Sequence, residues 1–219
     1  MYILAFDTTA ESCSICLKKD KVEVARFVKR MEFGQSEFLI PEIKKILDSV
    51  KLTFADLGLI VVCVGPGSFT GVRASIAAAR AFNIADENMP VMGVSAFEAY
   101  LYSLAPDELS DYNAVILETK RADFYYQVFD KERKPLVEAT ALTREEIIKD
   151  LQNKKVTLIG DGIERFLATP TGLSLHAIKI EFYPPIENVA SCGLDKYNQG
   201  IRDFPKPMYL RAPDVFVCR

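Results

Sequence analysis

The stretch "GPGSFTGVRASIAAARAF" (65–82) has the make-up of a phosphate-binding loop followed by a helix. Backbone N–H groups at glycine-rich turns and helix N-termini bind phosphate oxygens, so a nucleotide could be held here. A Walker A loop requires G-x-x-x-x-G-K-[ST], but Gly67 and Gly71 are one residue too close together and Val72 stands where lysine is needed. The dinucleotide pattern G-x-G-x-x-G also fails, because Thr70 occupies its last position.

A structural interpretation accounts for more of these residues. Gly65-Pro66-Gly67 can turn the chain off a buried strand, Ser68 or Thr70 can cap the helix, and Gly71 allows close packing in its first turn. The many alanines fit tight packing and simple helix propensity equally well. A bare helix N-terminus stabilises an anion by only about 0.3–1 kcal/mol, too little to hold a nucleotide unaided. The stretch therefore predicts the start of a helix.

Cysteine and histidine spacing argues against a metal or redox site. Cys13 and Cys16 form a C-x-x-C inside a strand-like run, where residues three apart point to opposite faces. No second pair completes a zinc site. The single histidine, His176, lies in the alternating run "LSLHAIKI", which favours an ordinary sheet position. We predict no metal site.

Composition is that of an ordinary globular protein of 219 residues, with 49% apolar residues and a net charge of −3. The charge gives no overall attraction to nucleic acid or anionic membranes. No apolar run reaches the roughly 18 residues of a membrane span, and Asp7 interrupts the early apolar run, so we expect neither a span nor a signal peptide. Five cysteines without an export signal indicate a reduced, cytoplasmic protein.

The order of predicted elements suggests two related halves. The first half reads as three hairpin-joined strands, a helix, a buried strand, the helix described above, another strand and a helix. The polar stretch 105–113 then precedes three more strands, a helix, two strands and a last helix. The predicted ranges are 2–9, 12–19, 22–30, 36–51 (starting near Phe38 or kinked, because of Pro41), 57–67, a helix within the 65–82 stretch, 90–95 and 96–104, then 114–120, 123–130, 135–142, 143–153, 155–162, 170–180 and 186–200, with an extended tail at 205–215.

This pattern predicts an α/β protein with two subdomains, residues 1–104 and 105–219, each a hairpin-containing mixed sheet flanked by helices. The last helix is a candidate to pack back on the first subdomain. A Rossmann domain is not expected, because simple alternation of strand and helix is missing.

The 65–82 stretch also resembles, almost residue for residue, the signature of the TsaB family of tRNA threonylcarbamoyladenosine biosynthesis proteins. "ILAFDTT", "QSEFLIPEIKKIL" and "PKPMYLR" agree with it, most strongly in residues 1–100. The resemblance implies the actin-like fold shared with sugar kinases and heat-shock ATPases. One departure is Gln35, where many relatives have histidine; it puts in doubt any pH- or metal-linked role of that position.

The resemblance also implies a role without chemistry. TsaB proteins look like degenerate relatives of TsaD, which transfers threonylcarbamoyl to N6 of adenosine 37 in tRNAs reading codons that begin with A. They pair with TsaD, work with the ATPase TsaE, and are expected to form homodimers when alone, with tRNA contacted only indirectly. TsaD-like proteins use an H-x-x-x-H metal pair, which a chain with one histidine lacks.

Two sets of site residues follow. In the actin-like fold the first hairpin supplies a phosphate-facing aspartate with hydroxyl neighbours, which matches Asp7, Thr8 and Thr9; the alternative is that they only shape the turn. No lysine lies near "GDG" (160–162), so no cofactor is expected beyond weak ATP or ADP with Mg²⁺. The resemblance places the TsaD contact on the first helix and the helix of the "GSFTGVR" stretch. The predicted interface residues are Phe38, Ser68, Phe69, Thr70, Val72, Arg73, Ile76 and Arg80.

Burial of Phe69, Val72 and Ile76 against the protein's own sheet is an equal alternative for those three. The rival function is an active enzyme, an actin-fold ATPase or kinase or a metallopeptidase-like hydrolase. The missing histidine pair and the missing phosphate lysine argue against it.

Overall fold

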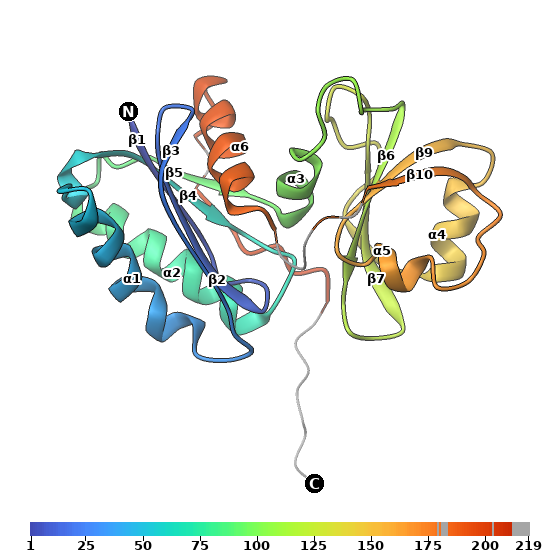
Figure 1. Cartoon of the computed structure of the whole chain (residues 1–219), viewed down its shortest axis with the longest axis horizontal. Coiled ribbons are helices and arrows are strands. Elements are labelled where there is room, and N and C mark those ends of the chain that lie inside the picture. The colour runs from blue at the N-terminus through green and yellow to red at the C-terminus, as the bar shows by residue number, and fades with distance from the viewer. Residues whose placement is uncertain (179, 181–183, 203, 212–219) are drawn as a thin grey trace, which may run out of the picture.

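The computed structural model describes residues 1–178, 180, 184–202 and 204–211, and in this part the chain forms two five-stranded sheets (Figure 1). The first sheet has the order β3-β2-β1-β4-β5. Its strands are β1 (Tyr2–Asp7), β2 (Ser12–Lys19), β3 (Val22–Arg30), β4 (Leu57–Cys63) and β5 (Val91–Val94). β1, β2 and β3 pair antiparallel, whereas β4 and β5 continue the sheet parallel to β1.

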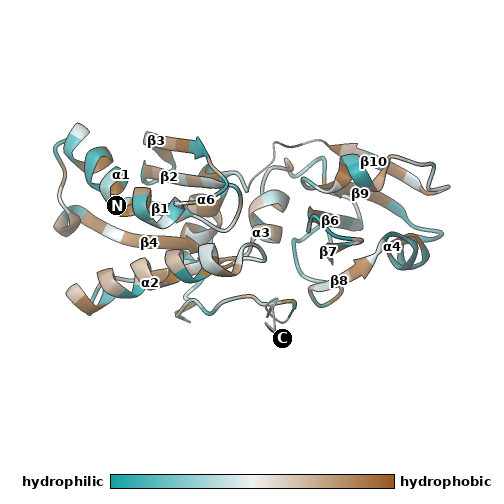
Figure 2. Cartoon of the chain, turned by 90° about the horizontal axis from the view of Figure 1, so that it is seen from below, coloured by the Kyte–Doolittle hydropathy of each residue, from teal (hydrophilic) through white to brown (hydrophobic). Residues whose placement is uncertain are grey.

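Helices cover both faces of the first sheet. α1 (Gln35–Ser49) and α2 (Phe69–Ala85) lie side by side on one face, and α3 (Ala96–Leu101) and α6 (Ile186–Asn198) lie on the other (Figure 1). β4 is buried on both faces, since Ile60 packs toward α1 and α2 and Val61 packs toward α6. This double burial explains its continuous apolar sequence, and the hydrophobic colour is accordingly strong along β4 in Figure 2.

The second sheet has the order β10-β9-β6-β7-β8. Its strands are β6 (Tyr112–Glu118), β7 (Asp123–Phe129), β8 (Thr140–Thr143), β9 (Lys155–Ile159) and β10 (Ser174–Ile178). α4 (Arg144–Leu151) and α5 (Ile163–Phe166) pack on one face, and α3 packs between the other face and the first sheet. The two sheets therefore share α3 as a common layer.

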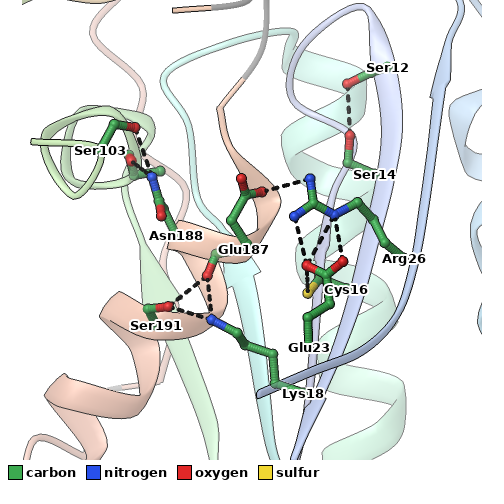
Figure 3. Close-up of polar contacts among 11 residues, drawn as sticks. Ser12, Ser14, Cys16, Lys18, Glu23, Arg26, Ser103, Glu187, Asn188 and Ser191 are labelled. Carbon is green, nitrogen blue, oxygen red and sulfur yellow. Dashed lines mark hydrogen bonds and ion pairs between the residues drawn. The ribbon is translucent and has the colours of Figure 1, made fainter. Parts of the chain in front are cut away.

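The last helix belongs structurally to the first sheet although it follows the second in sequence. The ammonium group of Lys18 on β2 donates to the Ser191 hydroxyl at 2.7 Å and to the Glu187 carbonyl at 3.3 Å (Figure 3). Arg26 on β3 pairs with the Glu187 carboxylate at 3.3 Å (Figure 3). These contacts attach α6 to β2 and β3, so the chain returns from the second sheet to the first.

Most predicted elements are present, with four differences. α1 starts at Gln35 rather than near Phe38 and keeps Pro41 inside it, because the buried stripe Leu39, Ile43, Ile46 and Leu47 holds the helix on the sheet. β8 is shorter than the predicted strand 135–142. α5 and a short 3₁₀ turn at Phe54–Asp56 were not expected. Residues 212–215 of the predicted tail lie outside the described residues.

None of the helices in the described part of the chain has the length and apolarity needed to cross a bilayer. Cys13 and Cys16 pack into the cores on opposite faces of the first sheet, as the strand pattern predicted.

Candidate functional site

The turn after β1 is packed directly on the first turn of α2. The Thr8 hydroxyl donates to the Gly71 carbonyl at 2.7 Å and lies 2.7 Å from the Ser75 hydroxyl. The Thr8 backbone N–H donates to the Ser75 hydroxyl at 3.1 Å, and the Ser68 N–H donates to the Thr9 carbonyl at 2.7 Å. The Ser68 hydroxyl caps the helix by accepting the Gly71 N–H at 3.3 Å.

Two glycines make this close packing possible. A Cβ atom on Gly71 would lie 1.9 Å from the Thr8 carbonyl oxygen, and one on Gly67 would lie 2.3 Å from the Thr9 carbonyl oxygen. Real Cβ atoms do not approach backbone that closely, so only glycine fits either position. The glycine-rich stretch therefore serves the start of α2 and its contact with β1.

The three residues of the predicted phosphate site, Asp7, Thr8 and Thr9, lie at the end of β1 and directly after it. Asp7 and Thr8 are fully buried and Thr9 is nearly so. α2 packs against Thr8, whereas Asp7 lies near Thr9 and Cys63. Asp7 Oδ1 accepts the Thr9 N–H at 2.7 Å, whereas Oδ2 has no hydrogen-bond partner among the described residues. Burial raises the pKa of Asp7, with the Thr9 hydrogen bond acting against the rise. The Thr8 hydroxyl is thus engaged with α2, and Asp7 has no exposed surface.

A cleft of about 770 Å³ lies between the two sheets and is lined by charged groups that are largely paired. Lys120 in the β6–β7 turn pairs with Glu11 in the β1–β2 turn and so joins the two halves. The Arg165 guanidinium holds the Glu118 carboxylate through two bonds of 2.8 Å. Of the residues that line the cleft, sequence reasoning named Thr9, Ser68 and Phe69 as site residues and noted Asp161 within "GDG". It missed the ion pairs, because pairs between distant turns leave no local pattern.

Asp161, the centre of "GDG", is the most perturbed carboxyl group of the cleft wall. Burial raises the pKa of Asp161 to about 7, and the nearby Glu118 carboxylate adds to the rise. The Glu118 N–H, which donates to Asp161 Oδ1 at 2.9 Å, acts in the opposite direction. A hydrogen bond from Tyr100 of α3 also favours the ionised form. This group can hold a proton near neutrality.

A second cavity of about 800 Å³ lies at the N-terminus of α6. Its polar lining is occupied by structural contacts: Arg26 is held by Glu23 and Glu187, and the Asn188 amide donates to the Ser103 hydroxyl at 2.8 Å (Figure 3). His176 lies exposed on the edge strand β10, and no three potential metal ligands gather in the described part of the chain.

The predicted interface residues divide into three groups. Val72 and Ile76 lie in the core against the first sheet, so the prediction that they form a docking surface is wrong. The physical reason is that the apolar stripe of an amphipathic helix faces its own sheet. Phe38 and Phe69 are half-buried, with Lys29 over the Phe38 ring and Arg73 over the Phe69 ring. The exposed members are Ser68, Thr70, Arg73 and Arg80.

The solvent side of α1 and α2 carries apolar residues that sequence reasoning missed. Phe33, which precedes α1, is 85% exposed, Ile84 of α2 is 79% exposed, and Ile40 of α1 is 45% exposed. Exposed Ala77 and Ala81 continue the α2 side. These five residues are called the outer face below. The sequence carried one signal of this face: Ile40 is apolar but lies outside the apolar stripe predicted to face the core.

Comparisons with known proteins agree with this architecture. A family model for TsaD, described as tRNA N6-adenosine threonylcarbamoyltransferase, matches residues 34–190. TsaB of Escherichia coli strain K12 is 24% identical over 96% of this chain and 95% of its own. TsaB of Buchnera aphidicola subsp. Schizaphis graminum is 34% identical over 42% of this chain, which spans 43% of that relative.

Solved structures show the same fold. A Pseudomonas aeruginosa protein described as similar to peptidase YeaZ superposes with a TM-score of 0.80 at 21% identity, covering 96% of this chain and 99% of that one. The ROK hexokinase of Thermus thermophilus gives a TM-score of 0.55 at 12% identity, covering 90% of this chain and 100% of that one. These likenesses confirm the predicted fold shared with sugar kinases. The chain belongs to the TsaD family of tRNA N6-adenosine threonylcarbamoyltransferases, and within it to the TsaB group.

Proposed function

We propose that this chain is a non-catalytic partner of TsaD in tRNA threonylcarbamoyladenosine biosynthesis. In this proposal TsaD transfers threonylcarbamoyl to N6 of adenosine 37 of tRNAs that read codons beginning with A, and this chain supplies a docking surface. The names of its relatives support the pathway. The complex also includes TsaE and works in the cytoplasm, and tRNA meets this subunit only indirectly.

The observation that carries the proposal is the outer face of α1 and α2. Phe33, Ile40 and Ile84 expose apolar side chains on neighbouring segments, with small Ala77 and Ala81 between them on α2. Exposed apolar side chains on two neighbouring helices are the surface type used in protein–protein contacts. Small residues let a partner helix approach α2 closely, within the 8–10 Å typical of packed helices. The same face accounts for the homodimer expected when TsaD is missing, since related surfaces can pair with themselves.

The non-catalytic part of the proposal is supported by the β1 turn. The Thr8 hydroxyl holds α2, and Asp7 is fully buried near Thr9 and Cys63. The turn after β1 therefore positions α2, the proposed docking helix, and does not position a nucleotide. We propose accordingly that Asp7, Thr8 and Thr9 hold no nucleotide.

The test is association with the TsaD counterpart from the same organism, measured by light scattering and by titration. Ile84→Glu and Ala77→Glu place a carboxylate on the outer face without touching the core. We expect each variant to weaken the heterodimer by roughly 30-fold or more, since burying an unpaired charge in an interface costs about 2–5 kcal/mol. Leu136→Glu is the matched control, because Leu136 is 47% exposed but lies in the second half of the chain.

Equal affinity of Ile84→Glu, Ala77→Glu and the wild-type chain would show that the partner uses another surface. No association of the wild-type chain would overturn the partner role itself.

A further inference from the structure

The segment that follows α6 forms a strap beside α2, with contacts from Phe69 to Arg80. This strap, Phe204–Arg211, runs between the two sheets (Figure 1). Pro205 and Pro207 have no N–H to donate. The structure gives the strap one backbone hydrogen bond to the rest of the described chain, from the Met208 N–H to the Val64 carbonyl at 2.8 Å. Pro205 is buried, and Phe204, Met208 and Leu210 pack against the cores, so Tyr209 is the part of the strap that can be displaced with the least loss of apolar contact.

The strap contacts α2 through side chains. The Tyr209 ring lies 5.0 Å from the Phe69 ring, centroid to centroid, and the Tyr209 hydroxyl accepts a hydrogen bond of 3.0 Å from Arg73 Nε. Arg73 also stacks on Phe69 at 3.7 Å. Further along the helix, the Arg80 guanidinium lies 5.5 Å from the Phe204 ring. Tyr209 nevertheless remains 42% exposed, so its contact with α2 is partly open to solvent.

The far end of the strap reaches the second sheet. Arg211 pairs with the Asp123 carboxylate on β7 and lies 5.6 Å from the Tyr125 ring. Met208 to Arg211 line the cleft between the sheets. One segment therefore touches both α2 and the wall of the cleft.

The strap lies beside the outer face. Ala77 and Ile84 stand four residues after Arg73 and Arg80, respectively, and at 3.6 residues per turn each is displaced by about 40° around the helix. A helix packed on Ala77 and Ile84 at an ordinary interaxial distance covers a wider arc than this. On the Arg73 side it would meet the Tyr209 ring, which lies against Phe69.

We propose that the strap is a latch, and that docking of the partner on α2 displaces Tyr209 from Phe69 and Arg73. The proposal rests on the proposed function, because it assumes that the partner uses the outer face. Release frees Phe69 and Arg73 to enter the interface and withdraws Met208–Arg211 from the cleft wall. Docking and the opening of the cleft are thereby coupled through one segment.

The first test is the affinity of Tyr209→Ala for the TsaD counterpart. The variant loses the ring and the hydroxyl that hold the latch, so we expect the heterodimer to be tighter by about 2- to 10-fold, the range of one aromatic contact. Leu136→Ala, an exposed apolar residue of similar accessibility far from α2, should leave the affinity unchanged. Weaker or unchanged binding of Tyr209→Ala would overturn the latch.

The second test follows amide hydrogen exchange in the full-length chain, free and in the complex. The Met208 amide should exchange faster in the complex, whereas the Val64 amide, bonded to the Val94 carbonyl at 2.9 Å, should stay protected. Equal or greater protection of Met208 would overturn the latch. If the wild-type chain associates with TsaD and Ala77→Glu does not, the docking proposal holds, and the Tyr209→Ala affinity and the Met208 exchange test only the latch. If the wild-type chain fails to associate, both proposals fall.

Discussion

At the scale of single residues, the turn Asp7–Thr9 explains the glycine-rich stretch. The sequence showed that the stretch breaks the known phosphate-loop patterns, and the structure supplies the reason for its glycines. Gly67 and Gly71 lie where the backbone of Thr9 and Thr8 passes, 2.3 and 1.9 Å from where a Cβ atom would be. No single-sequence pattern could show that contact, because it joins segments about 60 residues apart.

Thr8→Val should destabilise the protein by about 1–3 kcal/mol. The change keeps the shape of the side chain but removes the hydroxyl that donates to Gly71, which leaves buried polar groups unpaired. Thr8→Ser keeps the hydroxyl and is the control, with a smaller loss. Urea unfolding of the three proteins measures the difference, and equal stability of Thr8→Val and wild type would show that this contact contributes nothing.

Asp161→Asn should flatten the pH dependence of stability. The folded protein holds the Asp161 proton up to about pH 7, whereas the unfolded chain loses it near the usual 3.8. The raised pKa therefore favours the folded state at low pH, and its contribution is lost as pH rises from about 4 to 7. Between pH 5 and 8 the wild type should lose on the order of 2–3 kcal/mol more than the variant.

The measurement is the free energy of unfolding of both proteins at pH 5 and pH 8. Asparagine can still accept the Glu118 N–H, so the fold is expected to survive. Parallel pH profiles for wild type and Asp161→Asn would contradict the assignment of the titrating group.

At the scale of elements, hydrophobic periodicity predicted most helices and strands, and it failed where packing overrides local preference. Pro41 argued for a later start or a kink in the first helix, yet α1 begins at Gln35 and retains the proline. Sequence reasoning also could not decide whether Val72 and Ile76 face a partner or the protein's own sheet, and both are buried against the sheet. The residues on the opposite side of α2, Ala77 and Ile84, carry the outer face instead.

Pro41→Ala should stabilise α1. Proline in a helix interior is about 3 kcal/mol less favourable than alanine, and Pro41 is exposed, so the change should raise the free energy of unfolding by about 1–3 kcal/mol. Lys44→Ala on the same helix, which removes only the exposed pair with Asp48, should change it by less than about 0.5 kcal/mol. Thermal and urea unfolding check both values, and a destabilised Pro41→Ala would mean that the proline shapes the helix.

At the scale of the whole molecule, the element order predicted two related halves, and the family resemblance predicted the actin-like fold. The shared α3 layer was not predicted, because it depends on how the two sheets pack together. The cleft could not be predicted either, because its ion pairs join turns that the sequence keeps apart: Lys120 meets Glu11, and Arg211 meets Asp123. The strap was predicted as an extended tail, but its contact with α2 depends on how the chain returns after α6.

The most direct measurement of the central claim is threonylcarbamoylation of tRNA in a mixture reconstituted from this chain, its TsaD counterpart and TsaE. The account predicts that activity follows docking: Ile84→Glu should lose most of it, whereas the cleft variant Asp161→Asn should keep wild-type activity at saturating concentration. If Asp161→Asn still associates with TsaD but abolishes modification, the cleft of this chain takes part in the chemistry and the non-catalytic account is wrong.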